Sequence, residues 1–173
     1  MRTSTKSLVL SAAVAALYAV LSYLSGIFGL AYGPIQIRLS EALCVLPFLF
    51  PSTAGGLFIG CLISNLLSPY GVVDIICGSA ATLIAACLSA KMPNRKLAPL
   101  PPVLANGIII GAMLSWYEIG FTSGFGKLFL INAAWVALGE AVTCYVLGGL
   151  LLHTLPKIPF FRTMINAKNG GEQ

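Results

Sequence analysis

Residues 32–42 hold the side chains in this sequence that are best suited to binding a small polar molecule. The stretch reads YGPIQIRLSEA and brings Gln36 and Arg38 close to Glu41 at the start of an apolar segment. Only 9% of the chain is charged, so a basic and an acidic side chain beside an apolar segment require a reason. An amide, a guanidinium and a carboxylate offer directed hydrogen-bond donors and acceptors. We therefore interpret the stretch as part of a pocket wall.

Glu140 lies near the middle of the last apolar segment. An ionisable group at that depth in a membrane costs at least a few kcal/mol unless it is paired, neutralised or facing water, so it marks a functional-site hypothesis. In a helix, Asn132, Val136 and Glu140 share one face, and Trp135 borders it. The alternative is a protonated glutamate that only bonds a neighbouring helix.

Further polar and aromatic side chains fall near the ends of the apolar segments. Asp74 suits either a ligand contact or a helix N-cap. Trp116 suits either a pocket wall or an anchor at the membrane interface. We interpret Asn106 as a hydrogen bond that packs helices together. The residues expected in the outer half of the protein, with Glu140 beneath them, are Arg38, Glu41, Asn65, Asp74, Trp116, Asn132 and Trp135.

The composition indicates which elements must position these side chains. Hydrophobic residues make up 58% of the 173 residues, and the mean hydropathy is +0.93. A soluble domain is typically about half apolar and about a quarter charged, so we predict one all-helical membrane domain over residues 1–173. Segments near the roughly 20 apolar residues that cross a bilayer occupy about 8–25, 72–90, 101–118 and 128–152.

The apolar run 42–67 is interrupted by two prolines and a pair of glycines. Cytoplasmic loops carry an excess of Lys and Arg, and an even number of crossings must separate two loops on the same side. The run is therefore predicted to be a hairpin with arms at about 39–51 and 54–67, which makes six transmembrane helices with both termini cytoplasmic. Eight of the ten basic residues lie at the termini or in one loop: Arg2, Lys6, Lys91, Arg95, Lys96, Lys157, Arg162 and Lys168.

The sequence contains none of the familiar catalytic signatures. It has no serine-histidine-acid set, metal-ligand cluster or nucleotide-binding loop, so we expect no enzyme activity, metal or cofactor. The five cysteines are scattered through apolar segments and are interpreted as packing residues. The confinement of the basic residues to loops and termini argues against nucleic-acid binding. Energy for uphill transport would have to come from partner proteins or an ion gradient.

Five stretches carry a resemblance to a known family. They read YGPIQIRLSEA at 32–42, GLFIGCLISN at 56–65, DIICGSAAT at 74–82, LAPLPPVLAN at 97–106, and Gly139-Glu140. Over about residues 8–152 the chain resembles the QueT-type queuosine-precursor transporters, which are substrate-binding S components of energy-coupling-factor (ECF) importers. The resemblance implies six helices, capture of a ligand from outside, and docking on a membrane scaffold subunit with two ABC-type ATPases.

The ligands that this resemblance implies are 7-deazaguanines, namely queuine or its precursors preQ0 and preQ1. A carboxylate can accept two parallel hydrogen bonds from a guanine-like edge, and an amide or guanidinium can donate to its carbonyl. We expect Glu140 or Glu41 on the donor edge. Arg38, Gln36 or Asn132 is expected on the acceptors. One of the two tryptophans, Trp116 or Trp135, is expected to stack on the ring, and Asp74 is a candidate for the aminomethyl cation of preQ1.

The small residues Ala12 and Ala16 repeat one turn apart on the first predicted helix. From the residues alone, this spacing suits close packing within the chain. In the S components that the chain resembles, such a pattern forms the docking face for the scaffold subunit. Two alternatives remain open for the whole protein: an S component for a different vitamin-like substrate, and a membrane helix bundle that transports nothing.

Overall fold

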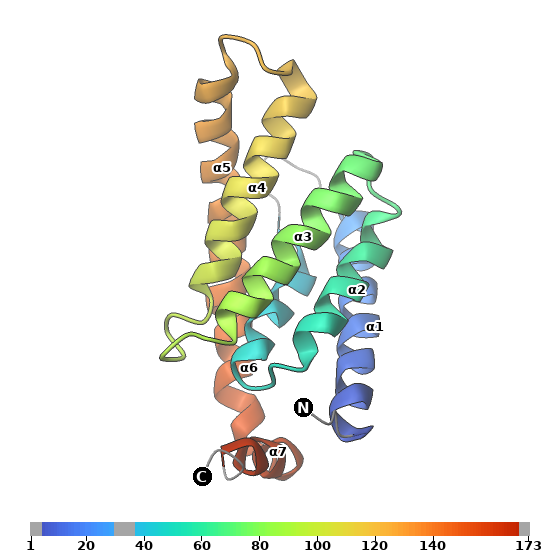
Figure 1. Cartoon of the computed structure of the whole chain (residues 1–173), viewed down its shortest axis with the longest axis vertical. Coiled ribbons are helices and arrows are strands. Elements are labelled where there is room, and N and C mark those ends of the chain that lie inside the picture. The colour runs from blue at the N-terminus through green and yellow to red at the C-terminus, as the bar shows by residue number, and fades with distance from the viewer. Residues whose placement is uncertain (1–4, 30–36, 170–173) are drawn as a thin grey trace.

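The protein is a bundle of helices in the computed structural model, which describes residues 5–29 and 37–169. No strand occurs within these two stretches. Figure 1 shows the long helices running roughly along one axis, with the start of α1 and the whole of α7 towards the same end. The elements in chain order are α1 Thr5–Ile27, the 3-10 helix η1 Leu39–Phe48, α2 Thr53–Asn65, α3 Val72–Ser89, α4 Leu100–Ile119, α5 Phe125–Ala141, the π-helix η2 Val142–Gly148, α6 Gly149–Thr154, the 3-10 helix η3 Leu155–Lys157 and α7 Pro159–Asn169.

Four segments of the described chain are long and apolar enough to cross a membrane. They are α1, α3, α4 and the continuous helical run Phe125–Lys157, with mean hydropathies of 2.0, 2.0, 1.3 and 1.7. Each coincides with one of the four long spans predicted from the sequence. The helices η1 and α2 are apolar but shorter. The count of six crossings and the cytoplasmic position of the termini stay predictions.

The apolar run 42–67 folds as two short helices joined by a turn, and the crossing of the membrane by these two helices as a hairpin stays a prediction. The first helix ends at Phe48 and the second begins at Thr53. Pro47 has no N–H to donate, and it lies one residue before the end of η1. A 3-10 helix rises about 2.0 Å per residue rather than about 1.5 Å. The short first arm therefore extends farther through the bundle than an α-helix of equal length.

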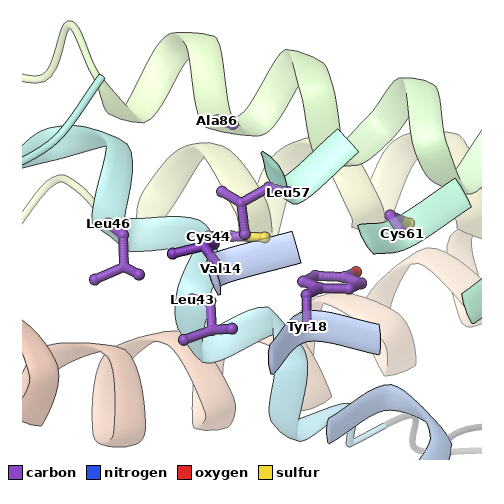
Figure 2. Close-up of a cluster of buried hydrophobic side chains, with 8 residues drawn as sticks. All are labelled: Val14, Tyr18, Leu43, Cys44, Leu46, Leu57, Cys61 and Ala86. Carbon is purple, nitrogen blue, oxygen red and sulfur yellow. The ribbon is translucent and has the colours of Figure 1, made fainter. Parts of the chain in front are cut away.

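The central element of the bundle is η1. Residues 40–47 are all buried, and η1 packs against α1, α2, α3, α4, η2 and α6. Its apolar side chains form a core with residues of three helices, as Figure 2 shows. The members of this core are Val14 and Tyr18 of α1, Leu43, Cys44 and Leu46 of η1, Leu57 and Cys61 of α2, and Ala86 of α3.

The last long helix changes its winding at η2, directly after Glu140 and Ala141. This π-helical segment packs against η1. At Gly148 an added Cβ would lie 2.9 Å from Cγ1 of Val45 and 3.1 Å from the backbone oxygen of Ala42. Single-turn π segments occur often at functional sites. The absence of a side chain at Gly148 allows η1 to approach the segment that follows Glu140.

Helix α7 was not predicted from the sequence, which was interpreted there only as a basic terminus. Its apolar side chains Phe161, Met164 and Ile165 pack against a cluster that includes Phe50, and the rings of Phe50 and Phe161 are 5.8 Å apart. Phe160, by contrast, is 61% exposed. Figure 1 shows α7 lying across the end of the bundle. The spacing of its apolar residues at i, i+3 and i+4 is the signal that predicts such a helix.

Close packing of α1 on α2 predicts a difference between two adjacent glycines. A Cβ at Gly56 would lie 2.1 Å from the backbone oxygen of Ser11, whereas a Cβ at Gly55 meets nothing within 4 Å. We expect Gly56→Ala to lower the free energy of unfolding by about 1–3 kcal/mol because the helices must separate. The matched Gly55→Ala variant should be neutral or slightly more stable, because alanine favours helix. Thermal unfolding of both variants in detergent tests this, and equal stability would contradict it.

Candidate functional site

Arg38 makes the ion pair of the first polar cluster. Its backbone is extended just before η1, and its Nη2 lies 3.4 Å from Oδ2 of Asp74. Its Nη1 donates to Oδ1 of Asn65 at 3.4 Å. The Asn65 amide in turn donates to the backbone oxygen of Asp74 at 3.0 Å. Because the Asp74 side chain is only 1% exposed and that of Arg38 is 11% exposed, the structure brings three predicted binding residues together in one buried cluster.

The two carboxylate oxygens of Asp74 are in different situations. Oδ2 also accepts a hydrogen bond from the Ser68 hydroxyl at 2.5 Å. Oδ1 is buried and has no hydrogen-bond partner among the described residues. Space for the cluster depends on Gly78, where an added Cβ would lie 2.4 Å from Nδ2 of Asn65 and 3.0 Å from Oδ1 of Asp74. A buried acceptor without a donor is costly, so Oδ1 is the atom of this cluster best placed to accept a ligand donor.

Glu41 anchors the second polar cluster and is 2% exposed. It accepts hydrogen bonds from the Tyr18 hydroxyl, from Sγ of Cys44 at 3.0 Å and from Nδ2 of Asn106 at 3.4 Å. Residues three positions apart eclipse in a 3-10 helix, which places Cys44 directly beside Glu41. The donors come from α1, η1 and α4. The Glu41 carboxylate therefore links three elements of the bundle.

Glu140 lies close to the Glu41 cluster and is 6% exposed. Its Oε2 is 3.6 Å from Sγ of Cys144, which is 3.4 Å from the backbone oxygen of Glu41. Cys144 is therefore a neighbour of both residues. The structure thus places both predicted carboxylates in one interior region. Asn106, interpreted from the sequence as a packing residue, is the amide that donates to Glu41.

Asn132 bonds residues outside these two clusters, and the two tryptophans are exposed. The Asn132 amide donates to the Ser115 hydroxyl at 3.1 Å and to Oε1 of Glu118 at 3.3 Å, which joins α5 to α4. Trp116 and Trp135 are 42% and 43% exposed. Neither tryptophan is buried with the acidic side chains. Stacking of one of them on a ligand ring stays a prediction.

Gln36 and the rest of residues 30–36 fall outside the part of the chain that the structure describes. A groove of about 560 Å³ lies between α1 and α2 and is lined mainly by apolar residues such as Tyr23 and Ile63. None of the predicted binding residues lines it. Arg38, Asn65 and Asp74 bond one another, whereas Glu41, Glu140 and Asn132 bond other side chains of the bundle, so a ligand would have to exchange with those bonds.

A polar stripe on α1 supports both clusters and was missed by the sequence interpretation. Tyr18 binds Glu41, the Ser22 hydroxyl donates to the Ser40 hydroxyl at 2.7 Å, and the Ser25 hydroxyl accepts from the backbone N–H of Leu39 at 3.0 Å. These three α1 residues are buried and recur at i, i+4 and i+7. That spacing on an otherwise apolar helix is a signal available from sequence.

The chemistry of the two clusters is that of binding by hydrogen bonds and charge. No group of three or more histidine, cysteine or acidic side chains among the described residues is arranged to hold a metal ion. All five cysteines are free thiols. A guanidinium, two amides and three buried carboxyl groups within an apolar bundle suit a small molecule with several N–H donors and a carbonyl.

Comparison with known proteins gives a family match and one curated relative. The family model described as QueT transporter matches residues 8–157. The chain is 38% identical over 94 residues to a protein of Lactococcus lactis subsp. cremoris (strain MG1363) named Queuosine precursor transporter QueT. That match covers 54% of this chain and 55% of the relative, so the chain spans about half of the relative's length. No solved structure gives a significant match.

The hydrogen bond from the Tyr18 hydroxyl to Glu41 is expected to stabilise the fold. Replacing Tyr18 with Phe keeps the ring but removes a donor to the buried Glu41 carboxylate. We expect the free energy of unfolding to fall by about 1–3 kcal/mol, because a buried acceptor loses a partner. Tyr23→Phe on the same helix is the matched control, since Tyr23 is 56% exposed. Thermal unfolding in detergent measures both, and equal midpoints would show that the Tyr18–Glu41 bond contributes nothing.

Proposed function

Because the chain belongs to the QueT transporter family, we propose that it binds a queuosine precursor and carries it across the cell membrane. The chain is a multi-pass membrane protein. The ligand class that we propose is a 7-deazaguanine: queuine, preQ1 or preQ0. The observation that carries the proposal is the family match over residues 8–157. The buried polar clusters supply the recognition chemistry.

The proposed ligand complements the charges of the two clusters. A deazaguanine edge has adjacent N–H donors, and the oxygens of the Glu41 and Glu140 carboxyl groups can accept hydrogen bonds from them. Its carbonyl can accept from the Arg38 guanidinium or from an amide. Oδ1 of Asp74, buried and without a hydrogen-bond partner, suits the aminomethyl cation that distinguishes preQ1 from preQ0. Gln36, Asn132 and one tryptophan complete the set that we propose.

Exchange of the present contacts for ligand contacts is energetically reasonable at Arg38. Its contacts with Asp74 and Asn65 are both 3.4 Å long. Charge-assisted N–H···O bonds are strongest at about 2.7–2.9 Å, so Arg38 can form a shorter hydrogen bond to a ligand carbonyl than either of these contacts. Arg38 belongs to the stretch 32–42 that is proposed as a pocket wall, and only Ile37 separates it from residues 30–36, which the structure does not describe.

We propose further that the chain is the S component of an ECF importer. In this arrangement six helices cross the bilayer, both termini are cytoplasmic, and a scaffold subunit with two ABC-type ATPases supplies the energy. Successive long helices run in opposite directions, and the start of α1 lies at the same end as α7, which supports an even number of crossings (Figure 1). Ala12 and Ala16 are both exposed on α1, as a docking face requires.

Ligand binding is the direct test of the proposed site. We expect purified protein to bind a deazaguanine in the micromolar range or tighter, and Glu140→Gln or Arg38→Ala to weaken binding about tenfold or more, equivalent to about 1.4 kcal/mol. Arg162→Ala is the control, because Arg162 is an exposed arginine of α7. Isothermal titration with queuine, preQ1 and preQ0 provides the measurement. No heat and no thermal stabilisation with any of the three would overturn the ligand class, and a panel of vitamin-like compounds would then test the alternative cargo.

The role of Asp74 can be tested by comparing the binding of preQ1 with that of preQ0. If Oδ1 of Asp74 accepts the aminomethyl cation, Asp74→Asn should weaken preQ1 binding about tenfold more than preQ0 binding, because only preQ1 carries that charge. Loss of the ion pair with Arg38 affects both ligands and cancels in the ratio. An unchanged ratio of the two dissociation constants would remove Asp74 from cation recognition while leaving the other site residues in place.

Docking on the scaffold can be separated from ligand binding. Ala16→Leu adds bulk to the exposed face of α1 and should abolish assembly with the ECF scaffold while deazaguanine affinity stays the same. Ala134→Leu adds the same bulk to an exposed position of α5 and should leave assembly intact. Co-purification and uptake into vesicles measure the two effects. Full uptake by Ala16→Leu would contradict docking through this face.

A further inference from the structure

A second recognition surface lies away from the polar clusters, between the loop that joins α3 to α4 and the segment η2–α6. It is a groove of about 410 Å³. Pro99 and Leu152 are buried at its base, whereas Arg95, Lys96 and His153 are exposed around it. Figure 1 shows the α3–α4 loop towards the same end of the bundle as α6 and α7. The groove thus combines an apolar base with a cationic rim.

The charges of the rim are not neutralised within the described part of the chain. No carboxylate there pairs with Arg95 or Lys96. Nζ of Lys157 lies 2.7 Å from Nε2 of His153, so a third cation reaches the same rim. The phenol of Tyr145, which also lines the groove, adds a hydroxyl. This combination offers several donors and positive charges to one anionic group.

The face beside the groove is suited to contact with lipid chains. Val146 and Leu150 lie on it and are 62% and 59% exposed. They belong to Phe125–Lys157, which is apolar and long enough to cross a membrane. Exposed aliphatic side chains on such a segment face hydrocarbon. The cationic rim therefore sits where an apolar membrane-facing surface ends.

Helix α7 supports the same position for the membrane surface. Its inner face is packed on the bundle through Phe161, while Phe160 and Arg162 are exposed. A helix across the end of a bundle with exposed aromatic and basic side chains is typical of the boundary between lipid and water. The groove and α7 thus lie towards the same end of the protein (Figure 1).

We propose that this groove binds the headgroup of an anionic phospholipid. Arg95 and Lys96 contact the phosphate, Tyr145 donates a hydrogen bond to it, and an acyl chain follows Val146 and Leu150. Basic pockets between helices on the cytoplasmic side are suited to anionic lipid headgroups. A soluble phosphate would use the rim but gain nothing from the apolar base or the aliphatic face. The combination of both surfaces favours a lipid.

Native mass spectrometry of the full-length protein in detergent tests this proposal. Phosphatidylglycerol and phosphatidylcholine with identical acyl chains are added in equal amounts. We expect preferential retention of phosphatidylglycerol, and a loss of roughly fivefold for each cation removed in the R95Q/K96Q variant. The control variant K6Q/K127Q changes the net charge equally at two exposed lysines that do not line the groove. It should retain the lipid as the wild type does.

Further measurements in this experiment distinguish a bound lipid from a soluble phosphate ligand. Millimolar glycerol 3-phosphate should not displace the lipid, and displacement would overturn the proposal in favour of a soluble phosphate ligand. Equal retention by wild type and R95Q/K96Q would overturn it, as would equal losses in both double variants. Thermal unfolding checks that R95Q/K96Q is folded, and K96Q alone replaces it if it is not. Deazaguanine affinity measured on the same samples reports the transport site independently.

Discussion

The buried carboxylate of Glu41 is the constraint on which the arrangement of this bundle depends. In an apolar interior an unpaired carboxylate is too costly to keep. Its donors come from Tyr18 on α1, Cys44 on η1 itself and Asn106 on α4. Because the three donors belong to different elements, satisfying one side chain fixes the distances between those elements. Apolar packing around η1 excludes water, which makes each of these bonds harder to replace.

The 3-10 geometry of η1 has consequences for the polar groups as well as for the packing. Arg38 precedes the helix in an extended conformation and pairs with Asp74 on α3, whereas Glu41 lies within the helix and turns towards α1 and α4. Two charges three residues apart in sequence therefore serve different clusters instead of pairing with each other. On the opposite side, the π-helical turn after Glu140 and the missing side chain of Gly148 let the last helix close on η1. The irregular helices η1 and η2 thus bring the carboxyl groups of Glu41 and Glu140 into one interior region.

The protein offers three different environments to binding partners: a polar interior, apolar outer faces and basic segments. Polar recognition is concentrated inside, where the family relationship and the buried donors and acceptors support a queuosine-precursor site. The outer faces are apolar and include the exposed Ala12 and Ala16 on α1. Basic side chains gather in the α3–α4 loop and near the end of the chain, where we propose that they meet the boundary of the membrane. Each of the three environments suits a different partner: a nucleobase-like ligand, a protein subunit and a charged lipid.

The sequence by itself determined that the chain is a helical membrane protein, where its four long apolar helices lie, and which costly polar residues need a purpose. Hydrophobic length and the cost of burying charge are local properties, so they can be derived from residue types and spacing. Only the tertiary structure decided which of those residues meet: Arg38 joins Asn65 and Asp74, Glu41 and Glu140 share Cys144 as a neighbour, and Asn132 bonds α4 instead. It also decided that Tyr18 completes the Glu41 site and that α7 covers the bundle end. These outcomes depend on how helices distant in sequence pack together, and spacing along one helix does not specify its partner.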